Sequence, residues 1–146
     1  MIMVRLILGF LKGAAIGAAI GYGAYLLGLG GAWCYLTFAV VGLLVGMLVG
    51  RPLWSHLLDK KSTVWASVLK GLFGVLLAEG VTLLVRKVAH DPSLSFAGER
   101  HSLTGWSYLF GGAFGALYGA WIEVDDAPAH VEPGLDRDPP VRRKKK

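Results

Sequence analysis

The feature that most constrains this chain is a long stretch without charge in its N-terminal third. No Asp, Glu, Lys or Arg occurs between Lys12 and Arg51. A transmembrane helix takes about 20 apolar residues, so this stretch is too long for one span and suits two. Gly28, Gly30 and Gly31 offer a turn in its middle. The stretch therefore predicts a membrane hairpin, and its spans are helical because an open sheet leaves backbone groups unsatisfied in lipid.

The rest of the chain extends this pattern to four apolar segments. Of the 146 residues, 54% are hydrophobic and only 17% are charged, whereas soluble domains carry about 25% charged residues. We predict an all-α membrane protein with four transmembrane helices over residues 6–28, 32–50, 63–85 and 105–122. Its parts are a first hairpin (1–50), an interfacial linker (51–62), a second hairpin (63–124) with an outer loop (86–104), and a disordered basic tail (125–146).

A repeated motif indicates that the two hairpins are tandem copies. Each copy is Trp-x-Tyr-Leu followed by two glycines four residues apart, and the copies are Trp33, Tyr35, Leu36, Gly42 and Gly46, then Trp106, Tyr108, Leu109, Gly115 and Gly119. A shorter Leu-Lys-Gly echo joins residues 11–13 to residues 69–71. Both hairpins would enter the membrane from the same side, so the pattern predicts a parallel repeat about an axis along the membrane normal.

The basic residues set the predicted orientation. One side of a four-span arrangement collects most of them, namely Arg5, Lys12, Arg51, Lys60, Lys61, Arg137 and the run Arg142, Arg143, Lys144, Lys145 and Lys146. The other side has Arg86, Lys87 and Arg100. The positive-inside rule then places both termini in the cytoplasm. We expect a protein of bacterial inner-membrane type, with its first span retained as a signal anchor.

Aromatic and lysine residues fall where the membrane interfaces are expected. Trp33, Tyr35, Trp106 and Tyr108 would lie at the outer interface, and Trp54, Trp65 and Trp121 at the inner one. Lys12 and Lys70 lie one or two turns inside the cytoplasmic ends of their spans. We expect their ammonium groups to snorkel to the lipid headgroups. A pore-lining or lipid-binding role is the alternative.

Glycines spaced by four residues predict helix-packing faces. Four residues turn a helix by about 400°, so successive glycines drift by only about 40° and form a slanted groove. The three rows are Gly9, Gly13, Gly17 and Gly21; Gly42, Gly46 and Gly50; and Gly111, Gly115 and Gly119. In lipid, where helices are not driven together by water, such grooves allow the close van der Waals contact that holds helices together. Some of these grooves are expected to face another subunit.

Glu79 is the one acidic residue well inside a predicted span. A carboxylate is costly there, so it should face protein or water. One interpretation is a proton or cation site. The other is structural, with Glu79 pairing with Arg86 on nearly the same helix face or hydrogen-bonding to Thr82.

Two further groups of polar residues carry weaker signals. The outer loop contains His90, Asp91, Glu99 and His101, but in no recognised metal-ligand spacing, so we predict no metal site. The basic tail is expected to bind anionic lipids, or only to fix topology, and we expect no nucleic acid partner.

The outline resembles V-type ATPase proteolipids, which are tandem, glycine-rich hairpins with one working carboxylate. Here Glu79 lies in the first helix of the second hairpin rather than in its second helix, so rotary proton transport is not carried over. Small size, several spans and a basic tail also resemble phage holins. Without a catalytic signature, we expect no enzymatic activity and no cofactor. The expected function is an accessory or assembly subunit, oligomeric or within a larger complex, with a holin-like or channel-like pore as the alternative.

Overall fold

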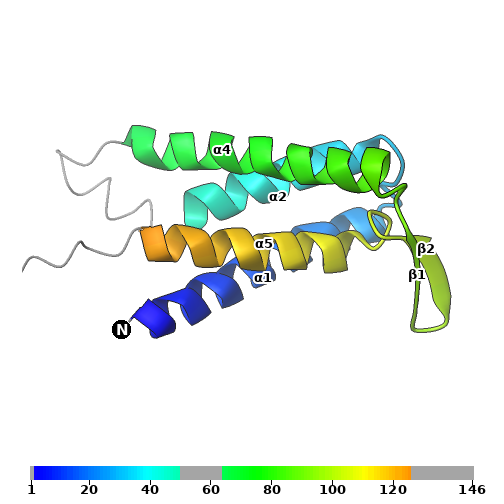
Figure 1. Ribbon diagram of the computed structural model, residues 1–146, viewed down its shortest axis with the longest axis horizontal. Coiled ribbons are helices and arrows are strands. Elements are labelled where there is room, and N and C mark those ends of the chain that lie inside the picture. The colour runs from blue at the N-terminus through cyan, green and yellow to red at the C-terminus, as the bar shows by residue number, and fades with distance from the viewer. Residues whose placement is uncertain (1, 50–63, 126–146) are drawn as a thin grey trace, which may run out of the picture.

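The computed structural model describes residues 2–49 and 64–125, and most of these residues are helical (Figure 1). The helices are α1 (Ile2–Leu26), α2 (Trp33–Leu48), α4 (Val64–Leu83), its π-helical continuation η1 (Leu84–Val88), and α5 (Ser107–Asp125). The predicted linker, Gly50, Trp54 and the basic run 142–146 lie outside the described residues.

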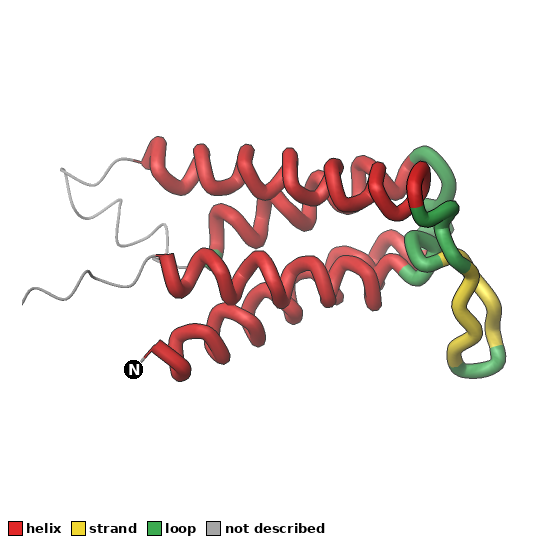
Figure 2. Tube along the Cα trace, in the orientation of Figure 1, coloured by secondary structure: helices red, strands yellow, loops and turns green. Residues whose placement is uncertain are grey.

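The prediction of an all-α chain is wrong in one place, the outer loop. There the strands β1 (Ser93–Phe96) and β2 (Glu99–Ser102) pair antiparallel and project from one end of the helices (Figure 2). The two residues between them, Ala97 and Gly98, have φ values of 51° and 85°. Positive φ at both turn residues is the geometry that matches the twist of a tight hairpin.

The two helical hairpins pack against each other so that α1, the first helix, lies along α5, the last. Figure 1 shows α1 beside α5 and α2 beside α4. Each glycine of the α1 row faces a backbone carbonyl of α5: Gly9 faces Gly119, Gly13 faces Gly115, Gly17 faces Gly111, and Gly21 faces Ser107. A Cβ on any of these glycines would lie within 3.0 Å of α5 backbone. Each position therefore accepts only glycine, whose Cα hydrogen can face the carbonyl oxygen in a weak Cα–H···O contact.

We call the close contact between α1 and α5 a seam. A second seam, between α2 and α4, is built in the same way. Gly42 approaches the Gly74 backbone, and Gly46 approaches Lys70 and Gly71. Gly71 and Gly74 are three residues apart, so this face does not carry the four-residue glycine spacing of the other rows. In both seams, backbone therefore packs against backbone. The described glycines of the three rows contact other helices of the same chain.

Larger side chains fill the space between the two seams. Phe38, Val41 and Val45 of α2 are at most 1% exposed and pack with Phe110 and Ile122 of α5. The Phe38 and Phe110 rings lie 4.6 Å apart between centroids. The middle of the bundle is thus a packed apolar core along the described helices.

Two helices, over Ile2–Leu26 and Trp65–Val88, are long and apolar enough to cross a membrane. The apolar helix α2 has 16 residues, about 24 Å at 1.5 Å per residue, which is shorter than a hydrocarbon core of about 30 Å. Helix α5 has 19 residues and ends in Glu123 and Asp125. The four predicted helices are present, and two of them have the length and composition of a span.

Candidate functional site

The most extensive set of side-chain contacts lies at the end of the bundle from which the β1–β2 hairpin projects. We call it the cap, and it centres on Trp106, Tyr25 and Asp91. Trp106, at the entry to α5, is 2% exposed. Its Nε1 donates a hydrogen bond to the Leu94 carbonyl at 3.0 Å, which fixes β1 to the bundle. Its ring stacks on Tyr25 at 5.9 Å and meets Phe96 edge-on at 5.7 Å. The second copy of the repeated motif therefore holds the hairpin in place.

Asp91 closes the cap at the end of α4. Its carboxylate accepts hydrogen bonds from the Thr104 amide at 2.9 Å and the Thr104 hydroxyl at 2.5 Å. His90 and Asp91 have φ values of 56° and 45°, which are uncommon outside glycine. The Asp91–Thr104 pair therefore stabilises this left-handed bend.

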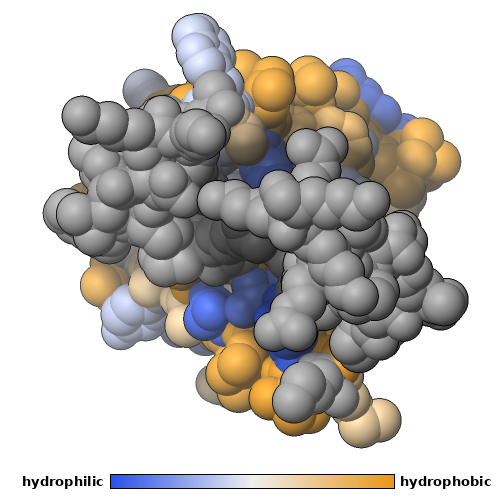
Figure 3. Space-filling view, turned by 90° about the vertical axis from the view of Figure 1, so that its left-hand side faces the viewer, coloured by the Kyte–Doolittle hydropathy of each residue, from blue (hydrophilic) through white to orange (hydrophobic). Residues whose placement is uncertain are grey.

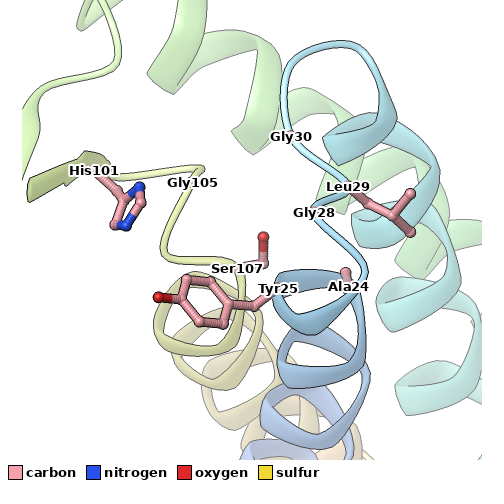
Figure 4. A pocket seen from close by; sticks show the side chains of 8 residues that line it. All are labelled: Ala24, Tyr25, Gly28, Leu29, Gly30, His101, Gly105 and Ser107. Atoms are coloured by element: carbon pink, nitrogen blue, oxygen red, sulfur yellow. The ribbon is translucent and has the colours of Figure 1, made fainter. Parts of the chain in front are cut away.

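A cavity of about 250 Å³ opens beside this cap, between the α1–α2 turn and the hairpin. In Figure 4 the Tyr25 ring, the His101 ring and the Ser107 hydroxyl come from three different elements around it. The Tyr25 hydroxyl donates a 2.6 Å hydrogen bond to Glu99, and His101 Nε2 lies 3.2 Å from the same carboxylate oxygen. These contacts lower the pKa of Glu99, first through Tyr25 and then through His101.

The Tyr25→Phe variant is expected to raise the Glu99 pKa towards its ordinary value of 4.5, because the carboxylate loses a donor that favours its charged form. In the wild type the folded-state pKa is the lower one. The contact therefore stabilises the cap above pH 4.5 and loses this effect as the pH falls through the folded-state value. An NMR titration of the Glu99 carboxyl carbon measures it. Tyr22→Phe is the control, and an unchanged Glu99 pKa in Tyr25→Phe would contradict the contact.

The first copy of the repeated motif has a different environment. Trp33 is 59% exposed, and the short α1–α2 turn does not cover it. Tyr35 lies beneath the guanidinium of Arg86, 5.1 Å from the ring centroid. Arg86 Nη1 also donates to the Gly31 carbonyl at 2.8 Å and to Cys34 Sγ at 3.3 Å. Arg86 thereby ties the end of α4 to the start of α2.

Glu79 lies at the edge of α4, half-buried. The side of α4 that faces α2 carries Gly71, Gly74, Ala78 and Thr82, and Glu79 is about 100° around the helix from Ala78. Both partners expected for a structural role are engaged elsewhere. Arg86 donates to the Gly31 carbonyl before α2 and to Cys34 within it, and the Thr82 hydroxyl donates to the Ala78 carbonyl at 2.7 Å.

Lys12 and Lys70 have protein partners that the sequence did not reveal. Lys12 Nζ lies 3.1 Å from Glu123 Oε1, and Lys70 Nζ lies 3.9 Å from Asp125 Oδ2. Both carboxylates sit in the last turn of α5, where the helix dipole disfavours negative charge. The two lysines, from the first helix of each hairpin, therefore neutralise one helix end. The Tyr118 hydroxyl adds a 2.6 Å hydrogen bond to the Lys70 carbonyl.

An apolar groove of about 420 Å³ separates α4 from α5 on the outer surface of the bundle. Phe73, Leu77 and Val81 form one wall, and Leu117 and Trp121 form the other. Trp65 and Trp121 are both largely exposed near the α4 start and the α5 end, where the inner interface was predicted. Glu79 lies on the opposite edge of α4 from Leu77, so the groove does not lead to the carboxylate.

The sequence-predicted site residues thus fall into separate places rather than one centre. The glycine rows line the two seams, Glu79 lies at a rim, and the aromatic pairs divide between an open and a capped helix start. Among the described residues, no three His, Cys, Asp or Glu side chains come together as a metal site. The chain matches no protein-family model, no curated protein and no solved structure.

Proposed function

We propose that this chain is a small integral membrane protein that acts as an accessory or assembly subunit, without enzymatic activity of its own. The supporting observation is the exposure of its two long apolar helices, Ile2–Leu26 and Trp65–Val88. Only 17% and 22% of the two candidate spans are buried inside the bundle, whereas a soluble core helix would be mostly buried. Figure 3, viewed along the bundle, shows hydrophobic residues along much of the visible rim. Lipid is the medium that suits such a surface.

We further propose that all four helices span the membrane, with both termini in the cytoplasm of a bacterial inner membrane. The seams support a duplicated pair of hairpins. Gly119 approaches Gly13 as Gly46 approaches Gly71, and these pairs follow the repeat offsets of the sequence. The short α2 would then require a locally thin bilayer or flanking interfacial residues, both of which cost little.

A partner would meet a different surface from the one that the glycine spacing suggested. The α1–α5 and α2–α4 seams occupy the glycine rows of the described chain. We therefore place association, with a second copy or with another subunit, on the exposed apolar faces, where Leu76 and Leu117 are 70% and 71% exposed. The basic tail is proposed to add contact with anionic lipids.

The alternative is a pore with Glu79 near the path of a proton or cation. The observation in its favour is a half-buried carboxylate on a candidate span whose expected partners are engaged elsewhere. Because side chains fill the core around Phe38 and Val41, such a path would lie at an interface between copies of the chain.

Proton and cation flux into liposomes tests the two functions. We expect no flux from folded wild-type protein, and the same from the Glu79→Gln variant, because the accessory function needs no path. Flux in the wild type that Glu79→Gln loses, while Glu99→Gln keeps it, would overturn the accessory proposal in favour of the pore. Size-exclusion chromatography of each variant confirms that it is folded before flux is compared.

A further inference from the structure

The strongest unassigned feature is a pair of cations at the end of α4. Arg86 and Lys87 lie in the π-helical turn Leu84–Val88 and, with Tyr35, line a cavity of about 270 Å³. A π-helical turn is rare and occurs often at functional sites, since it displaces side chains from their usual helical positions. Two cations at a helix C-terminus satisfy the dipole, but this alone requires no cavity between them and the neighbouring helix.

Arg86 is held in one position with part of its guanidinium available. The contacts to Gly31 and Cys34 both use Nη1, and the Tyr35 ring lies against the plane of the group. The edge that carries Nε and Nη2 makes no hydrogen bond to the described residues. Two parallel N–H donors of this kind match the oxygens of a phosphate.

Protein carboxylates offset only part of the positive charge at this site. The negative charge of Asp91 acts on Arg86, but both Asp91 oxygens accept hydrogen bonds from Thr104. Among the described residues, neither Arg86 nor Lys87 forms an ion pair with a carboxylate. Lys87 is exposed and lines the cavity with Arg86. Trp33, exposed at the first residue of α2, is of the type that anchors at the level of lipid headgroups.

We propose that Arg86 and Lys87, against the Tyr35 ring, bind the phosphate of an anionic phospholipid. Arg86 would hold two phosphate oxygens and Lys87 would add the second positive charge. An anionic lipid is favoured over a zwitterionic one, because a zwitterionic headgroup brings its own cation. The inference rests on the proposed membrane location, and it names a site separate from the basic tail.

The test is native mass spectrometry of the full chain in detergent, titrated with phosphatidylglycerol or phosphatidylcholine. We expect preferential retention of phosphatidylglycerol and about fivefold weaker retention in Lys87→Gln, the effect of one basic residue near an anionic surface. Arg86→Lys keeps the charge and loses the two-pronged donor, so it should also weaken retention. Arg100→Gln, which removes a cation from the hairpin at the same end, is the matched control.

Three results would overturn the site. These are equal retention of both lipids, an equal loss in Arg100→Gln, and displacement of the lipid by millimolar inorganic phosphate in all variants alike. The tail is present in every variant, so it does not contribute to the differences. Alkaline extraction of the wild type from membranes separates the two proposals: release would refute the membrane location, whereas retention with no lipid preference would refute only the site.

Discussion

The Gly13→Leu variant is expected to lose more than about 3 kcal/mol of stability, the largest effect of any single substitution in the seams. Overpacking a core usually costs about 1–3 kcal/mol because flexible side chains can move aside. At Gly13 the obstacle is the backbone of Gly115, so α1 and α5 must separate to make room. Unfolding of the purified protein in mixed micelles with increasing SDS, followed by circular dichroism, measures the loss.

Gly23 provides the matched control in the same helix. A Cβ at Gly23 would meet nothing within 4 Å. The Gly23→Ala variant should therefore be neutral or more stable by up to about 1 kcal/mol, the helix propensity difference between the two residues. If Gly13→Leu unfolded at the same SDS fraction as the wild type, the direct contact between α1 and α5 would be refuted.

The Trp106→Ala variant is expected to lose about 3–5 kcal/mol, the usual cost of removing a buried large aromatic side chain. The substitution removes the stacking partner of Tyr25 and the donor to the Leu94 carbonyl, so the hairpin should detach from the bundle. Micelle unfolding measures the stability. Hydrogen exchange of the β1 and β2 amides measures the detachment.

Trp33 holds the same place in the first copy of the motif, and it is the natural control. Because its ring is 59% exposed, Trp33→Ala should cost no more than about 0.5 kcal/mol, as expected for a surface position. Similar losses in the two variants would contradict the difference in burial. Trp106→Phe should fall between them, since it keeps a ring but loses a hydrogen bond that contributes about 1 kcal/mol.

The helices could be predicted from the sequence because their signals are local. Lack of charge from Lys12 to Arg51 and the turn glycines determine α1 and α2 without any knowledge of their neighbours. The four-residue spacing around Gly13 and Gly115 likewise identified faces that are in close contact. The glycine spacing does not predict which helix packs on which, because glycine has no side chain that would select a particular partner.

The features that the sequence did not reveal depend on contacts between distant segments. Arg86 was considered a partner for Glu79 because they share a helix, but it crosses to the carbonyl of Gly31, 55 residues away. The β-hairpin could not be predicted because each of its strands has only four residues. Their side chains are mostly exposed, so the strands show no pattern of burial. Ala97-Gly98 was its one local signal.

The seam between α1 and α5 also has a consequence for biosynthesis. Gly13 meets Gly115, and at about 5–20 residues per second the ribosome takes roughly 5–20 s to make the chain between them. In the proposed membrane topology, α1 enters the bilayer first, and its backbone-lined face stays unmatched for about this interval. The last helix to be inserted is the one that covers the first, so α1 must be accommodated by lipid or by the insertion machinery until translation is nearly finished.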